Sequence, residues 1–212
     1  MHQLFIGDLL VFILLSYSLD CIHLEIEKDG RFFTTGNESN TSELVELLQK
    51  FAVEKFTSSR LLETDQFGSL AIIVTTDYEA LYAYKHGDYQ RCLQLSTENV
   101  HTLLNAIRMA CVVVHEVFIQ LLDDDIVSLT ALRLIVNPNC GQYTVYRKIM
   151  QVTLSLYLMT QCQLKLRHSV TSLAETLHYI KLAQRRTPVN NTLDQLILRL
   201  ACCKIVTELT RY

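Results

Sequence analysis

The clearest pattern of apolar and polar positions lies between Asp77 and Ile107. Apolar or small residues recur three or four positions apart on either side of Gly87-Asp88, as one buried face of a helix requires. Gly87 can adopt the positive φ that ends a helix, and the Asp88 side chain can accept hydrogen bonds from the free N–H groups that open the next one. The pattern therefore predicts two helices folded back on each other, with further helices stacked on them to bury their remaining apolar surface.

Helical spacing continues through most of the rest of the chain. The segments expected to be helical are Ile126–Val136, Tyr143–Leu166, the stretch after the turn at Arg167–Ser169 and the stretch after the break at Thr187–Asn191. Ser172 with Glu175 gives a capping-box signature near one of these helix starts. In the first segment the residues expected to reach the core are Leu129, Leu132 and Leu134–Val136. The sequence thus predicts a mainly α fold of stacked antiparallel helical hairpins.

Shorter patterns precede the central hairpin. Ile22–Glu27 alternates apolar with polar residues, and an Asp-Gly turn and Phe32–Thr35 follow, which predicts a short β-hairpin. A polar loop then leads into a helix whose apolar face is expected to hold Leu44, Leu47, Leu48 and Phe51. Leu70–Val74 fits a strand as well as a buried turn of helix. We expect an N-terminal part, residues 1–75, to pack on an α-helical hairpin part, residues 76–212, as one structural unit.

The first residues allow two interpretations. Leu9–Leu15 is an apolar run followed by Ser16 and Ser18, small residues of the kind a signal peptidase requires, but no Lys or Arg precedes it. Asp8, just before the run, can instead cap a buried helix, which is the interpretation we favour. Cleavage of residues 1–18 as a secretion signal is the alternative. The run is too short for a membrane span, so no membrane association is expected.

A further spacing pattern surrounds the central turn. The residues concerned are Ala80, Gly87, Tyr89 and Cys92, spaced like the small residue, glycine, tyrosine and alanine of a tetratricopeptide hairpin, whose repeat is about 34 residues. The chain resembles that family here but departs from it at Glu79, where the family usually has leucine, and at Leu104, where its closing proline would be. The resemblance implies stacked helical hairpins with a groove between successive first helices.

A second resemblance covers about two thirds of the chain. The stretches that carry it are YAYKHGDYQRCLQLS, LLDDDIVSLTALRLIVNP and LYLMTQCQLKLRHSVTSLAETLHYI. They are similar to a helical region in large uncharacterised invertebrate proteins, a group with no known activity. This resemblance implies that the chain is a fragment or a truncated paralogue of a larger protein.

Composition narrows the class of partner. Half of the 212 residues are hydrophobic, 19% are charged and the formal net charge is −3. Such a chain can bury a core but lacks the cationic excess of a nucleic-acid-binding surface. Its seven cysteines include no C-x-x-C pair and are odd in number, which favours free thiols in a reducing, cytoplasmic compartment. Glycosylation sequons at Asn37, Asn40 and Asn190 matter only if the chain is secreted.

Candidate chemistry is weak throughout. His115-Glu116 begins like a zinc-protease motif, but Ile119 stands where the second histidine is required. Cys111 and His115 could share a helical face, yet a tetrahedral site needs further ligands. Asp123–Asp125 could bind a divalent cation, although capping of the following helix explains it more simply. We therefore assign no catalytic, cofactor-binding or metal-binding residues.

The function favoured by these patterns is a non-enzymatic α-helical protein-interaction module with an unidentified protein partner. Tyr82, Lys85 and His86, on the first helix of the central pair, are the candidate interaction residues. Packing of Tyr82 beneath a neighbouring helix is an equally good explanation of that residue. A secreted or membrane-tethered helical glycoprotein is the alternative function, and an enzyme of unrecognised type ranks last.

Overall fold

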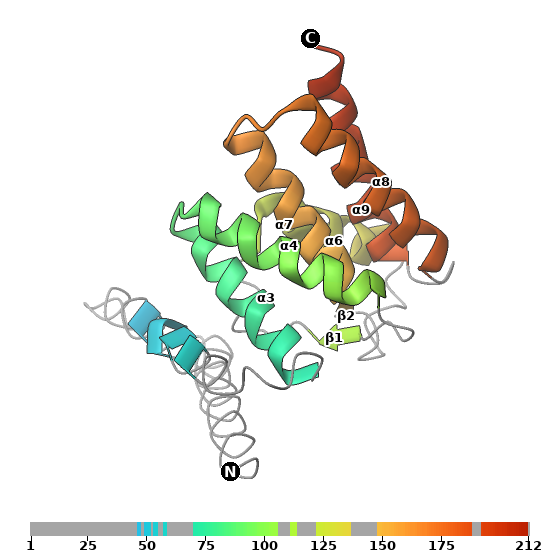
Figure 1. The fold of residues 1–212 in the computed structure, drawn as a ribbon. Helices are drawn as coiled ribbons and strands as arrows, with labels where there is room; N and C mark the ends of the chain where they lie inside the picture. Colours follow the sequence, from blue (N-terminus) through green and yellow to red (C-terminus); the bar gives the residue numbers. More distant parts are fainter. Residues whose placement is uncertain are drawn as a thin grey trace, which may run out of the picture.

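The computed structural model describes residues 46, 47, 49–51, 53, 54, 57, 58, 70–105, 111–113, 122–136, 148–187 and 192–211. These residues are mainly α-helical, which confirms the predicted fold class (Figure 1). The helices are α3 (Leu70–Lys85), α4 (Tyr89–Asn105), α6 (Asp124–Val136), α7 (Gln151–Lys165), α8 (Val170–Arg186) and α9 (Thr192–Leu209). Two short strands, β1 (Cys111–Val113) and β2 (Lys148–Met150), pair antiparallel with Cys111 opposite Met150.

Several N-terminal predictions fall outside the described residues. They are the helix beginning at Asp8, the β-hairpin of residues 22–35 and the glycosylation sequons. Leu70–Val74, left open between strand and helix, is the first part of α3. This helix runs without interruption through the expected division between residues 75 and 76.

The turn at Gly87-Asp88 is confirmed. Gly87 has a φ of +80°, its N–H donates to the carbonyl of Tyr84 at 3.1 Å, and the Asp88 N–H donates to that of Ala83 at 2.9 Å. This hydrogen-bond pair defines a Schellman motif, which satisfies carbonyls left free at the end of α3. The Asp88 carboxylate then accepts from the Arg91 N–H at 3.1 Å and caps α4. The hairpin is therefore specified by local hydrogen bonds at both helix ends.

A second Schellman turn joins α7 to α8 and contains no glycine. The Arg167 N–H donates to Leu164 at 3.3 Å and the His168 N–H to Gln163 at 2.9 Å, while Arg167 itself takes a φ of +54°. The predicted capping box was wrong, because Ser169 caps α8 by accepting from the Ser172 N–H. The left-handed turn brings Ser169 into position three residues before the predicted cap.

The helix predicted over Tyr143–Leu166 is shorter than expected. Lys148–Met150 forms β2, and α7 begins only at Gln151. A continuous apolar run fits either helix or strand, so its own pattern does not decide between them. Pairing with β1 decides it, together with a hydrogen bond of 2.8 Å from the Met150 N–H to the Asp194 carboxylate on α9.

Two predicted apolar faces are only partly buried. In α6, Leu129 packs against the core as expected, but Leu132 is 54% exposed and Ile135 is 77% exposed. Among the helical positions between 46 and 58, Leu47 is 63% exposed whereas Val53 is buried. Apolar residues occur on more than one side of each helix, so the neighbouring helix determines which side is covered.

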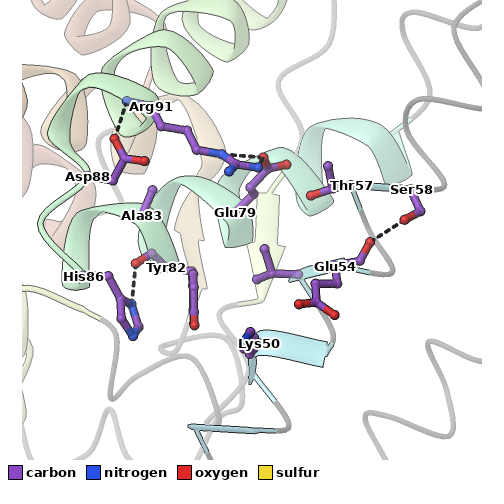
Figure 2. A pocket seen from close by; sticks show the side chains of 11 residues that line it. Lys50, Glu54, Thr57, Ser58, Glu79, Tyr82, Ala83, His86, Asp88 and Arg91 are labelled. Carbon is purple, nitrogen blue, oxygen red and sulfur yellow. Dashed lines mark hydrogen bonds and ion pairs between the residues drawn. The ribbon is translucent and has the colours of Figure 1, made fainter.

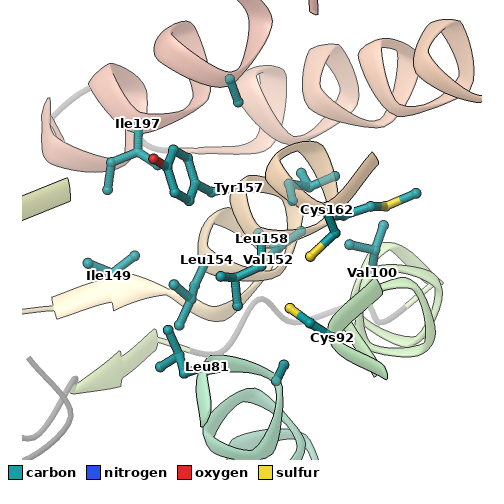
Figure 3. Close-up of a cluster of buried hydrophobic side chains, with 14 of the residues drawn as sticks. Leu81, Cys92, Val100, Ile149, Val152, Leu154, Tyr157, Leu158, Cys162 and Ile197 are labelled. Atoms are coloured by element: carbon teal, nitrogen blue, oxygen red, sulfur yellow. The ribbon is translucent and has the colours of Figure 1, made fainter. Parts of the chain in front are cut away.

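The core is organised around α7. Every residue from Gln151 to Gln163 is buried, because α3, α4, α8 and α9 all pack against this helix, α4 most extensively. Figure 3 shows the side chains of α7 meeting those of α3, α4 and α9 in one apolar cluster. A helix covered on all sides must also satisfy its polar side chains inside the protein.

Asp77 of α3 provides one of these internal partners. Its carboxylate accepts from the Ser155 hydroxyl of α7 at 2.8 Å and from the Asn99 amide of α4 at 2.9 Å, so it ties three helices together. The second oxygen, Oδ2, is buried and has no partner within the described part of the chain. Burial raises the pKa of Asp77 to about 7, against the opposing effect of these two hydrogen bonds.

The two left-handed residues should respond oppositely to substitution. No atom lies within 4 Å of a Cβ placed on Gly87, so Gly87→Ala tests backbone strain alone and should lower the free energy of unfolding by about 1 kcal/mol. Arg167→Gly should raise it by about 0.5–1 kcal/mol, since the strain at φ +54° is relieved. Urea denaturation followed by circular dichroism measures both. A shift of the same sign for the two variants would contradict this account.

The buried carboxyl of Asp77 should make the protein less stable as pH rises. Its pKa is about 7 in the folded protein and near 3.8 when unfolded, so the folded state holds the extra proton between these values. The free energy of unfolding should fall from about pH 4 to about pH 7, by up to roughly 1.4 kcal/mol per pH unit, with no further loss from this group above that range.

Asp77→Asn tests the assignment, because an amide keeps the shape of the neutral acid without its titration. Urea midpoints measured from pH 4 to 8 should lose most of their slope in this variant. Asp88→Asn is the matched control, since Asp88 is exposed and Asn caps a helix as well as Asp does. Equal slopes in Asp77→Asn and the unmodified protein would show that another group titrates.

Candidate functional site

A groove of about 590 Å³ lies beside the central hairpin (Figure 2). One wall is formed by α3 and the start of α4, and the other by the helical positions between 46 and 58. The lining residues are Lys50, Val53, Glu54, Thr57 and Ser58 on one side and Glu79, Tyr82, Ala83, His86, Asp88 and Arg91 on the other. The Schellman turn positions the second group, because it sets the direction in which α4 leaves α3.

Two of the three candidate interaction residues line this groove. Tyr82 lies in the last turn of α3 and His86 directly follows that helix, with stacked rings whose centroids are 4.0 Å apart. The His86 Nδ1 lies 2.9 Å from the Tyr82 carbonyl oxygen. Lys85 is exposed in the last turn of α3 and is not part of the lining. Tyr82 is half-buried and packs against the core, while its role in an interaction stays a prediction.

The groove also contains an ion pair that the sequence did not single out. Arg91 donates from Nε and Nη2 to the Glu79 Oε1, at 3.0 and 2.5 Å, across the hairpin. The Glu79 side chain is 2% exposed and that of Arg91 is 49% exposed, so the pair joins the core to the groove surface. The signal that could have revealed it is a glutamate on an otherwise small and apolar helix face, which requires a nearby partner.

Among the described residues around the groove, carboxylates outnumber permanent cations. Glu54, Glu79 and Asp88 line it with Lys50 and Arg91, and Glu46 stands at its edge, 3.6 Å from the His86 Nε2. Burial raises the pKa of Tyr82, and the nearby charges of Glu46 and Glu54 raise it further.

Some polar groups of the groove have no partner among the described residues. The Lys50 ammonium and the Glu54 carboxylate make no ion pair there, although the two side chains are four residues apart. The Thr57 hydroxyl oxygen is buried without a hydrogen-bond partner in the same part of the structure. These groups can therefore bind a ligand without first breaking an internal contact.

The acidic run Asp123–Asp125 serves a structural role. Asp123 caps α6 by accepting from the Asp125 N–H at 3.0 Å, as predicted, and it also accepts from the hydroxyls of Tyr84 and Tyr157, each at 2.8 Å. Asp125 pairs with Lys204 of α9. Burial opposes ionisation of Asp123, but the hydrogen bonds from Asp125, Tyr84 and Tyr157 lower its pKa below the ordinary value. These contacts connect α6 to α3, α7 and α9.

Within the residues that the structure describes, no three His, Cys, Asp or Glu side chains are arranged to hold a metal ion. His115 and Glu116 lie outside those residues. None of the described helices combines the length and the apolar character needed to cross a membrane.

Comparison with known proteins adds no assignment. The chain matches no protein family, no curated protein and no solved structure. The groove and its side chains are therefore the basis for a functional proposal.

Loss of the guanidinium from the ion pair should destabilise the protein. Arg91→Ala removes a positive partner of the buried Glu79 carboxylate, and solvent access to Arg91 should limit the loss to about 1–2 kcal/mol. Arg185→Ala, in the exposed last turn of α8, is the matched control and should cost less than about 0.5 kcal/mol. Chemical denaturation measures both, and Glu79→Gln combined with Arg91→Ala should recover part of the loss. Equal effects of the two arginine variants would contradict a special role for Arg91.

Proposed function

We propose that this chain is a non-enzymatic α-helical protein-interaction module that binds a cationic peptide segment in the groove beside α3. The observation that carries the proposal is the excess of carboxylates around a groove that also has an aromatic wall. Since Arg91 is paired with Glu79, the charges left to face a ligand are those of Glu54 and Asp88 against Lys50, with Glu46 at the edge. A peptide carrying arginine or lysine complements this charge pattern.

The remaining lining of the groove suits the same ligand. Val53, Ala83 and the ring of Tyr82 supply apolar surface for the methylene groups of a long cationic side chain. An aromatic ring also attracts a guanidinium or ammonium group through its π electrons. The Thr57 hydroxyl can accept a hydrogen bond from such a group. Affinity should come from several small contributions rather than from one buried anchor.

The stacking of the hairpins supports an interaction module of tetratricopeptide type. Helix α7 packs against both α3 and α4, and α9 packs against both α7 and α8, so successive helices cover the preceding pair. Two features differ from that family. Residues 106–150 separate the two hairpins, and the groove lies between α3 and the preceding helical positions rather than between α3 and α7.

We further propose that the module works in the cytoplasm. Cys92, Cys162, Cys202 and Cys203 are free thiols, and free thiols persist in reducing compartments. Secretion as a glycoprotein is the competing proposal, and no described residue favours it.

The proposal predicts selective binding of a basic peptide. A fluorescein-labelled octapeptide of alternating arginine and alanine should bind with a Kd on the order of tens of micromolar, because exposed charge pairs contribute little individually. The counterpart with glutamate in place of arginine should bind at least tenfold more weakly. Fluorescence anisotropy at 50 and 300 mM NaCl measures both, and higher salt should weaken the basic peptide several-fold.

Charge variants of the groove provide the test of location. Glu46→Gln with Glu54→Gln should weaken binding of the basic peptide about fivefold, whereas Lys50→Gln should strengthen it, since one removes attraction and the other repulsion. Glu98→Gln, on an exposed part of α4 outside the groove, is the matched control and should have no effect. Preference for the acidic peptide, or equal loss in Glu98→Gln, would refute the proposal.

A further inference from the structure

Two cysteines face each other at the centre of the core. Cys92 of α4 and Cys162 of α7 have no exposed surface, and they belong to the two helices that contact each other most extensively. Figure 3 shows their sulfur atoms pointing toward one another across this contact. The Cys92 sulfur also lies 3.8 Å from the Ser96 hydroxyl oxygen on the same helix. Both cysteines are therefore more than small apolar side chains filling a core.

We propose that Cys92 and Cys162 are a redox pair, and that oxidation by a peroxide joins them in a disulfide that clamps α4 to α7. A disulfide requires two sulfur atoms directed at each other from Cβ atoms about 3.5–4.5 Å apart. Because the two sulfur atoms point toward each other across the contact between α4 and α7, the side chains are already directed for that bond.

The reaction balances with peroxide as the only co-reactant. The sulfur of one cysteine attacks a peroxide oxygen, the O–O bond breaks, and a sulfenic acid and water form. The second sulfur then attacks the sulfenic sulfur, the S–O bond breaks, and a second water leaves. The two sulfurs together lose two electrons, hydrogen peroxide gains them, and both thiol protons end in water.

Burial of the two cysteines should slow formation of the disulfide. The neighbouring Cys92 thiol and desolvation raise the pKa of the Cys162 thiol, so its reactive thiolate is scarce in the packed core. Peroxide reaches the pair only when α4 separates locally from α7. The pair should consequently respond to sustained oxidation rather than to a brief pulse, and the disulfide should hold the helices together once it forms.

Formation of the disulfide should also change the groove. This part of the inference rests on the proposed function. Arg91, which lines the groove and pairs with Glu79, immediately precedes Cys92 on α4. Disulfide formation shortens the sulfur–sulfur separation to about 2.05 Å, so α4 must move toward α7 next to Arg91. Oxidation should therefore alter the groove wall and weaken binding of the basic peptide by at least about threefold.

The linkage can be read directly from tryptic peptides. Cleavage after Arg91, Arg108, Lys148 and Lys165 leaves each cysteine of the pair as the sole cysteine of its peptide, residues 92–108 and 149–165. The full chain carrying Cys202→Ser and Cys203→Ser is treated with hydrogen peroxide, alkylated in denaturant, digested and analysed by mass spectrometry. The two peptides should be found joined, and the melting midpoint should rise by at least about 5 °C.

Two controls keep the result decisive. Cys162→Ala, or Cys92→Ser if the first variant does not fold, should yield neither the joined peptides nor the rise in melting midpoint. Recovery of both cysteines as alkylated thiols, or of either one linked to a different cysteine, would overturn the proposal.

Measurements of peptide binding test separately whether the disulfide changes the affinity of the groove. Anisotropy with the arginine–alanine octapeptide is measured on reduced protein, on oxidised protein and after dithiothreitol, which should restore the reduced affinity. Equal affinity of the reduced and oxidised forms would overturn the regulation of the groove. If the reduced protein does not bind the peptide, the proposed function fails, while the joined peptides still decide whether the clamp exists.

Discussion

The burial of α7 from Gln151 to Gln163 is the constraint on which the rest of the structure depends. A helical segment with no solvent-facing side needs neighbours all around it, and α3, α4, α8 and α9 supply them. It also needs partners for its polar side chains, because an unpaired buried polar group costs about as much as a lost hydrogen bond. Ser155 donates a hydrogen bond to Asp77, Tyr157 donates one to Asp123, and Gln163 accepts one from Thr176. These pairs orient the surrounding helices, whereas the Gln151 side-chain amide, the Thr153 hydroxyl and the Gln161 Nε2 are buried without a hydrogen-bond partner in the described part of the chain.

The same constraint orients the proposed binding groove. Asp77 holds one side of α3 against α7 through Ser155, and the next turn of α3 carries Glu79 and Tyr82 into the groove. A carboxyl group so placed costs stability when it ionises, but it leaves α3 little freedom to rotate. Core packing and groove geometry are thus two consequences of how one helix is held.

Polar contacts at helix junctions also explain why this protein does not need a regular repeat to stack its hairpins. Asp123 accepts from tyrosines on α3 and α7, and Asp125 pairs with Lys204 on α9, so the segment between the hairpins is bound to both. The facing thiols of Cys92 and Cys162 lie within this same helix-packing scheme. Each of these cysteines therefore contacts another thiol in the core rather than apolar side chains alone.

The sequence by itself determined the features that depend on hydrogen bonds within about five residues. Gly87 and Asp88 carried the information for the central hairpin, and Asp123 for the start of α6, because caps and Schellman turns involve only adjacent parts of the chain. Of the candidate site, the sequence supplied Tyr82 and His86. The left-handed turn at Arg167 is also local, but no glycine marks it in the sequence. Tertiary structure alone decided that Lys148–Met150 is a strand, that Leu132 is exposed and that Glu79 meets Arg91. Each of these depends on which distant segment lies alongside, and helical periodicity specifies an apolar face without specifying the neighbour that covers it.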